Sequence, residues 1–132
     1  MASATLSLKV KVIEGKDLLA KDKNGLSDPY VKLSVPPQKH RTTVKSATLR
    51  PQWNEEFTFV NMQTDSELRL RIFDHDKFSK DDFMGAYHFP ASELLKIKAS
   101  GQAADLWLQL KNKKGEHDQE RGTLHVKLEW SA

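Results

Sequence analysis

The chain of 132 residues is long enough for one domain with a buried core and too short for two, and it contains no cysteine for a disulfide framework. Its 38% hydrophobic and 30% charged residues include no apolar run that could span a bilayer, and residues 1–10 lack the pattern of a secretory signal. We therefore expect a cytoplasmic domain, and the net charge of +3 without a concentrated basic tract gives no reason to expect a nucleic-acid partner.

Apolar residues recur at every second position through most of the chain, as in half-buried strands. In the first such segment, Leu6, Leu8, Val10 and Val12 fall on one face. Turn-forming pairs of residues separate the segments. Strands are predicted, in chain order, over residues 6–13, 30–35, 39–47, 54–60, 68–73, 84–89, 105–110 and 122–130.

One short helix is predicted over residues 91–98, directly after Pro90, with Ser92 as its cap. Eight short strands joined by turn-rich loops favour an all-β fold, an eight-stranded antiparallel β-sandwich. We expect a single domain over residues 1–132 with its strand core at about 6–130, and we expect Trp53, Trp107 and Trp130 to pack in that core.

Two acidic segments stand out beside predicted strands: DKNGLSDPYVKL at residues 22–33 and DHDKFSKDDFMG at residues 74–85. The second does not fit an EF-hand loop, because Phe78, Ser79 and Gly85 occupy positions that need an oxygen ligand, a glycine and a glutamate. The scattered histidines do not have zinc-site spacing, and no phosphate loop or nucleophile motif is present. We therefore expect a protein that is not an enzyme.

The carboxylates of the two segments favour a divalent cation if the fold brings them together. Two unit negative charges about 4 Å apart repel by roughly 4 kcal/mol at an effective dielectric constant near 20. Calcium takes about six to eight oxygen ligands, which aspartates supply well, whereas magnesium demands a tighter octahedron. Calcium is the expected cofactor.

Three separated motifs, GKDLLAKDKNGLSDPYVKL, TLRPQWNEEFTF and LRIFDHDKFSKDDFMG, resemble the successive motifs of a C2 domain over residues 6–130. The resemblance implies a C2 fold whose calcium-binding loops cluster at one end and dock on phospholipid membranes. The order of the motifs and the closing RGTLHVKLEW are similar to the phospholipase-like topology, type II.

The resemblance also implies a set of calcium ligands and a function. The ligands fall on Asp22, Asp28, Asp74, Asp76 and Asp82, with Ser79 as a weaker ligand and backbone carbonyl groups of Lys21 and Lys77 as further donors. Asp17 and Asp81 are interpreted as turn or solvated residues outside this set. The implied function is calcium-dependent binding of a monomeric peripheral module to anionic phospholipids of the phosphatidylserine type. The alternative is a calcium-independent protein–protein interaction sandwich.

Two residues at the loop tips are candidates for membrane contact. Phe78, flanked by Lys77 and Lys80, lies where the family often places a side chain that inserts into the bilayer interface, although it could instead fold back onto the sandwich. Leu26 is the second candidate, and its alternative role is to pack under its own loop.

Some C2 domains bind phosphoinositides through a lysine-rich strand face, and this chain matches that pattern in part. Lys32 and Arg41 fit it, with Lys39 and Lys45 nearby. Ser34 and Thr43 occupy places where related domains can carry lysine, and outward lysines also serve to prevent edge-to-edge aggregation.

Overall fold

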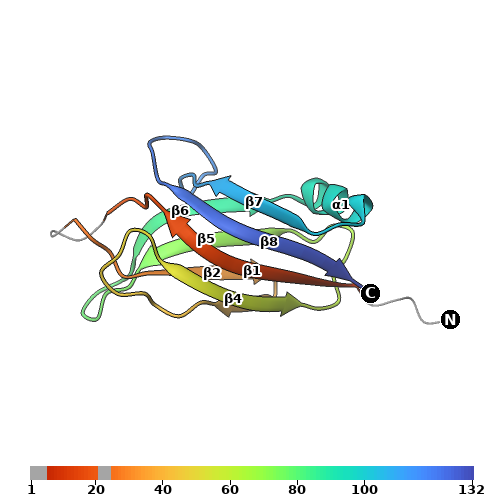
Figure 1. Ribbon diagram of the computed structural model, residues 1–132, viewed down its shortest axis with the longest axis horizontal. Coiled ribbons are helices and arrows are strands. Elements are labelled where there is room, and N and C mark those ends of the chain that lie inside the picture. Colours follow the sequence, from red (N-terminus) through yellow and green to blue (C-terminus); the bar gives the residue numbers. More distant parts are fainter. Residues whose placement is uncertain (1–5, 21–24) are drawn as a thin grey trace.

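In the computed structural model, which describes residues 6–20 and 25–132, two four-stranded antiparallel sheets pack face to face (Figure 1). The first sheet has the order β4-β1-β8-β7 and the second β3-β2-β5-β6. The elements are β1 Ser7–Lys16, β2 Pro29–Val35, β3 Gln38–Arg41, β4 Gln52–Phe59, β5 Leu68–Asp74, β6 Asp82–Phe89, α1 Ala91–Ser100, β7 Ala104–Gln109 and β8 Thr123–Ser131. The predicted β-sandwich is confirmed.

The core lies between the sheets and follows the period-two pattern of the sequence. In β1, Leu8, Val10 and Val12 are fully buried, and the second sheet faces them with apolar residues such as Leu70 and Ile72. In β1 and β5 most of the alternate residues are exposed or partly buried, whereas in β2 the outward-facing Tyr30 and Ser34 are buried as well.

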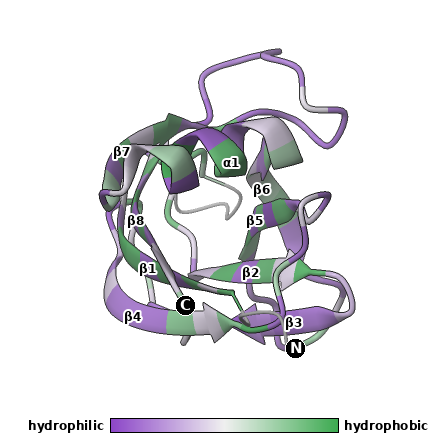
Figure 2. Cartoon of the chain, turned by 90° about the vertical axis from the view of Figure 1, so that its right-hand side faces the viewer, coloured by the Kyte–Doolittle hydropathy of each residue, from purple (hydrophilic) through white to green (hydrophobic). Residues whose placement is uncertain are grey.

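Helix α1 lies across the top of the sandwich between β6 and β7 when the molecule is viewed along its strands (Figure 2). Leu94 is its buried residue, and the indole nitrogen of Trp130 donates a hydrogen bond to the Leu94 carbonyl at 3.1 Å. The Ser92 cap prediction is wrong: the N-cap position is Pro90, and no side chain caps the helix. In the described part of the chain, no helix has the length and apolarity to cross a membrane.

The antiparallel connections put residues 17–20 and 25–28 and the loops at 42–51, 75–81 and 110–122 at one end of the sandwich (Figure 1). We call this the loop end. The segment 42–47 belongs to it because β3 ends at Arg41, earlier than predicted. Its backbone leaves the strand while still bonded to β2, with Thr42 N donating to the Val31 carbonyl at 2.9 Å, and Ala47 has a positive φ of 51°.

Two of the three tryptophans pack as expected. Trp53 is 5% exposed, and Trp130 packs against the core from a partly buried position. Trp107 is 49% exposed and stacks on His125, with ring centroids 4.4 Å apart. Its core prediction is wrong because its neighbour Leu108 takes the inward position on the edge strand β7.

Candidate metal centre

The second sheet brings three of the predicted aspartates to the loop end by strand pairing. Asp74 is the last residue of β5 and lies opposite both Pro29 on β2 and Asp82 on β6. Asp28 immediately precedes Pro29, so the carboxylates of Asp28, Asp74 and Asp82 come from three adjacent strand ends. Strand pairing thus places residues that are far apart in sequence at neighbouring strand ends.

Backbone hydrogen bonds hold two of these carboxylates in position. The Asp28 backbone nitrogen donates to Asp74 Oδ1 at 2.8 Å, and the Ala47 backbone nitrogen donates to Asp28 Oδ1 at 2.6 Å. The Asp74 side chain belongs to a residue that is only 2% exposed. Because a buried carboxylate is costly unless it is compensated, the hydrogen bond from Asp28 helps to stabilise Asp74, which is the most buried of these carboxylates.

The Asp76 carboxylate accepts hydrogen bonds from within its own loop, at residues 75–81, and so stabilises the conformation of that loop. Its carboxylate accepts hydrogen bonds from the Phe78 backbone nitrogen at 2.8 Å, the Ser79 backbone nitrogen at 3.2 Å and the Ser79 hydroxyl at 2.8 Å. These bonds, chiefly that from Phe78, lower the pKa of Asp76 and keep it ionised. Ser79 is thus a partner of Asp76 in this structure.

Asp81 is more than a solvated residue, which corrects the sequence interpretation. It accepts a hydrogen bond from the Tyr30 hydroxyl and another from the Asp76 backbone nitrogen at 2.9 Å, and it lies 3.6 Å from His75 Nδ1. The Tyr30 bond is the main reason why the pKa of Asp81 is lowered, and burial together with this bond raises the pKa of Tyr30 to about 12. A buried tyrosine needs a partner for its hydroxyl, and Asp81 supplies that partner here.

The donor set fits calcium by its chemistry. Four aspartates, Asp28, Asp74, Asp76 and Asp82, lie on or beside the strand ends of the second sheet, and all their donors are oxygens, as calcium prefers. Each ionised carboxylate has about four acceptor positions, so the hydrogen bonds described above leave capacity for a cation. Within residues 6–20 and 25–132, however, no three carboxylate or imidazole groups stand close enough together to hold a metal ion. The predicted donors Lys21 and Asp22 lie outside the described residues.

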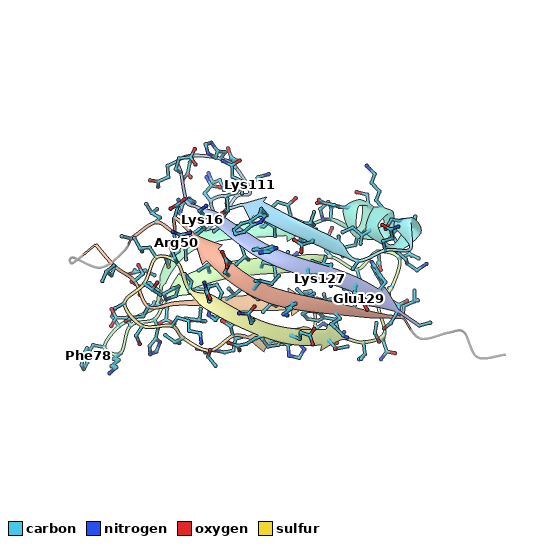
Figure 3. The ribbon with its side chains drawn as sticks, viewed as in Figure 1. Lys16, Arg50, Phe78, Lys111, Lys127 and Glu129 are labelled. Atoms are coloured by element: carbon cyan, nitrogen blue, oxygen red, sulfur yellow. The ribbon has the colours of Figure 1, made fainter. Side chains whose placement is uncertain are left out.

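Phe78 projects from the tip of the loop at 75–81, at the extreme of the loop end (Figure 3). It is 96% exposed, which contradicts the alternative that it folds back onto the sandwich. Lys77 and Lys80 on either side are exposed as well. Leu26 is partly buried, which agrees better with packing under its loop than with insertion into a membrane.

Lys32 and Arg41 are brought together on the outer face of the second sheet, where they lie opposite each other on β2 and β3. The Lys32 ammonium lies 4.7 Å from the centroid of the Phe73 ring, and the Arg41 guanidinium lies 4.3 Å from that of Tyr30. Both cations therefore rest on a pair of stacked aromatic rings next to the loop end.

Comparison with known proteins agrees with this architecture. The family model of the C2 domain matches residues 6–110, so the chain belongs to the C2 domain family. It is 40% identical to extended synaptotagmin-1 of Mus musculus over 129 residues, which cover 92% of this chain and 11% of that protein. The chain thus spans about a tenth of the length of this curated relative.

Solved structures share the fold. The C2A domain of plant extended synaptotagmin 1 superimposes with a TM-score of 0.79 at 27% identity, covering 95% of this chain and 93% of that one. The calcium-bound C2A and C2B domains of extended synaptotagmin 2 match with a TM-score of 0.78 at 31% identity, covering 94% of this chain and 45% of that one. The phospholipase-like, type II order of the strands stays a prediction.

Proposed function

We propose that this C2 domain binds anionic phospholipid membranes, of the phosphatidylserine type, in response to calcium. The observation that carries the proposal is the alignment of Asp28, Asp74 and Asp82 at three adjacent strand ends, beside a loop whose tip exposes Phe78. The calcium-bound structure of a similar domain supports the choice of ion.

The aspartates of the loop end would hold the ion, with Asp74 deepest and Asp76 and Asp82 nearer the tip. Bound calcium supplies positive charge and open coordination positions that phosphate or carboxylate oxygens of lipids fill. Without the ion, the same carboxylates repel an anionic surface. The loop end therefore acts as an electrostatic switch, in which the sign of the local charge decides whether the domain approaches the membrane.

The tip of the loop at 75–81 supplies a second contribution. Phe78 is 96% exposed, so inserting it into a membrane breaks almost no packing within the protein. Burying such a side chain in the membrane interface is worth about 1.5–3 kcal/mol. Lys77 and Lys80 each add about 1 kcal/mol near an anionic surface. These contributions bring the domain to the membrane as a peripheral, monomeric module.

We also propose a location and a role for the domain. It works in the cytoplasm, is recruited to the membrane surface when calcium binds, and binds lipid without catalysing a reaction. Lys32 and Arg41, which rest on the rings of Phe73 and Tyr30 beside the loop end, are placed to contact a phosphoinositide headgroup once the domain has docked.

Vesicle sedimentation tests the proposal. The wild-type domain should sediment with phosphatidylserine vesicles in calcium and stay in solution in chelator, while a variant with Asp76→Asn and Asp82→Asn should stay in solution in both. Asp65→Asn is the matched control, because Asp65 is exposed in the connection between β4 and β5 at the opposite end. Sedimentation that ignores calcium, or none at all, would contradict the proposal and favour the calcium-independent protein-interaction module.

A further inference from the structure

Strand β7 forms one edge of the first sheet, and its backbone hydrogen bonds show which residues face that edge. One residue past β7, the Leu110 nitrogen donates to the Gly122 carbonyl on the β8 side at 3.0 Å. Lys111, the next residue, turns the other way and exchanges two hydrogen bonds with Ala86 on β6, at 2.9 and 2.8 Å. Backbone groups of successive residues in a strand point to opposite sides, and β7 pairs with β8 without a register shift. Even-numbered residues of β7 therefore face β8, and odd-numbered residues face the open edge.

The odd-numbered residues at the open edge are Asp105, Trp107 and Gln109, and all three are exposed. Within the part of the chain that the structure describes, no backbone group bonds to theirs on that side. The middle of β7 lies between α1 on one side and the loop at 110–122 on the other (Figure 1). A row of unpaired N–H and C=O groups is a template for pairing with another strand.

The other three sheet edges carry features that discourage such pairing. Strand β3 is only four residues long, and two of them are cations. At β6, Arg121 donates to the Met84 carbonyl at 2.9 Å. At the end of β4, the Gln38 amide bonds both backbone groups of Val60, at 2.7 and 2.9 Å. Strand β7 has no cation, proline or register shift, so it is the least protected of the four edges.

We propose that β7 is a self-association surface, which pairs antiparallel with β7 of a second copy of this chain and joins the two first sheets into one. A twofold axis at Trp107 pairs all three outward residues at once. Trp107 then lies opposite its own copy, and cross-strand aromatic pairs stabilise a sheet. Asp105 lies opposite Gln109 of the second copy, whose amide can donate to the carboxylate. On the core side, the partly buried Leu106 meets Leu108 of the second copy.

The sequence of β7 disfavours the other registers. An axis at Asp105 would set two carboxylates opposite each other, which destabilises a strand pair. An axis at Gln109 would require backbone groups of Lys111, which are already bonded to β6. An axis midway between two outward residues would leave the third without a partner in the strand. This match of the strand to itself in one register is the reason for choosing a second copy over an unrelated peptide.

The contact is small, because one short strand of each copy takes part. Stable interfaces bury about 800 Å² per partner, so we expect a dissociation constant of about 0.1–1 mM and a monomer at micromolar concentration. Antiparallel pairing points the two loop ends in opposite directions, and no aspartate of the proposed calcium site lies on β7. The pairing therefore needs no calcium, which separates a failure of this proposal from a failure of the calcium-dependent one.

Disulfide trapping tests the register, since the chain contains no cysteine of its own. Asp105→Cys and Gln109→Cys are prepared separately and oxidised, alone and as a mixture, at about 100 µM in calcium chelator. In the proposed register, positions 105 and 109 of the two copies form a hydrogen-bonded pair with Cα atoms about 5.5 Å apart, which a disulfide can join. The two copies of position 105 lie about 14 Å apart along the strands, which is too far for a disulfide.

We expect the mixed dimer to form in about tenfold or greater yield than either single-variant dimer, as measured by mass spectrometry of the intact proteins. Thr58→Cys is the control, because Thr58 is exposed on β4, and its mixture with Gln109→Cys should give only background yield. Equal yields in the mixed and single reactions would overturn the proposal.

Sedimentation equilibrium tests the association without cysteines. The average mass of the wild type should rise above that of the monomer between about 10 µM and about 1 mM. Gln109→Pro removes only an outward N–H group, and Trp107→Lys sets two cations opposite each other, so both variants should stay monomeric while circular dichroism shows that they are folded. A wild type that stays monomeric over this range, or association that both variants retain, would overturn the proposal.

Discussion

Arg121 ties the loop at 110–122 to the second sheet, and its replacement by lysine should destabilise the fold. Its guanidinium donates to Asp118 through Nε and Nη2, both at 2.9 Å, and through Nη1 to the Met84 carbonyl at 2.9 Å. The residue is 8% exposed, and its guanidinium carbon lies 5.5 Å from the centroid of the Phe83 ring. A lysine has no planar fork and cannot satisfy both partners at once.

The Met84 carbonyl sets the size of the effect. Leaving a buried acceptor without its partner costs about 1–3 kcal/mol, so Arg121→Lys should lower the free energy of unfolding by about 2 kcal/mol near neutral pH. The hydrogen bonds from Arg121 lower the pKa of Asp118 to about 2. Because the unfolded pKa is near 4, this pair stabilises the fold fully above about pH 4 and less as the pH falls toward 2.

Urea unfolding followed by tryptophan fluorescence, at about pH 7 and about pH 3, measures both effects. The wild type should lose stability between the two values, and Arg121→Lys should lose less, since the pKa of Asp118 returns toward its usual value in the variant. Arg50→Lys is the control, because Arg50 is exposed. A variant within about 0.5 kcal/mol of the wild type, with an unchanged pH dependence, would refute this account.

Three further substitutions test other parts of the structure. Tyr30→Phe removes the hydrogen bond to Asp81 and should lower the free energy of unfolding by about 1.5 kcal/mol in a urea titration, and an Asp81→Ala background, which has no acceptor for the Tyr30 hydroxyl, should abolish most of that loss. Phe78→Ala should leave this free energy within about 0.5 kcal/mol of the wild type while weakening vesicle binding about tenfold, and equal vesicle binding would contradict the membrane role. Gly122→Ala should cost at least about 2 kcal/mol, because φ is 89° and the new Cβ would lie 2.5 Å from a backbone carbonyl oxygen. Gly115→Ala, with φ 80° and open space around it, should cost about 1 kcal/mol, and equal thermal unfolding of the two variants would show that the close contact is unimportant.

The strands were predictable because burial on one face imposes a period of two. In β1 and β5 the alternation is nearly unbroken, and the structure places every second residue in the core. Strand ends were less predictable, since a strand was expected over residues 39–47 and β3 ends at Arg41. Trp107 was misplaced because size alone does not say which face a residue takes, whereas the alternation of its neighbours does.

The metal-ligand set stays a prediction, and the contacts around it were less predictable than its residues. The resemblance pointed to Asp28, Asp74 and Asp82, and strand pairing places these residues at neighbouring strand ends. The hydrogen bond between Tyr30 and Asp81 joins strand β2 to the loop at 75–81, so no local sequence pattern indicated it.

Calorimetric titration of calcium tests the central claim most directly, with and without phosphatidylserine vesicles. It compares the wild type with a variant carrying Asp74→Asn and Asp76→Asn, which keeps the side-chain oxygens that accept the hydrogen bonds from Asp28 and Phe78. The account predicts saturable binding that tightens when vesicles are present and disappears in the variant. Absence of calcium binding in the wild type, with or without vesicles, would contradict it.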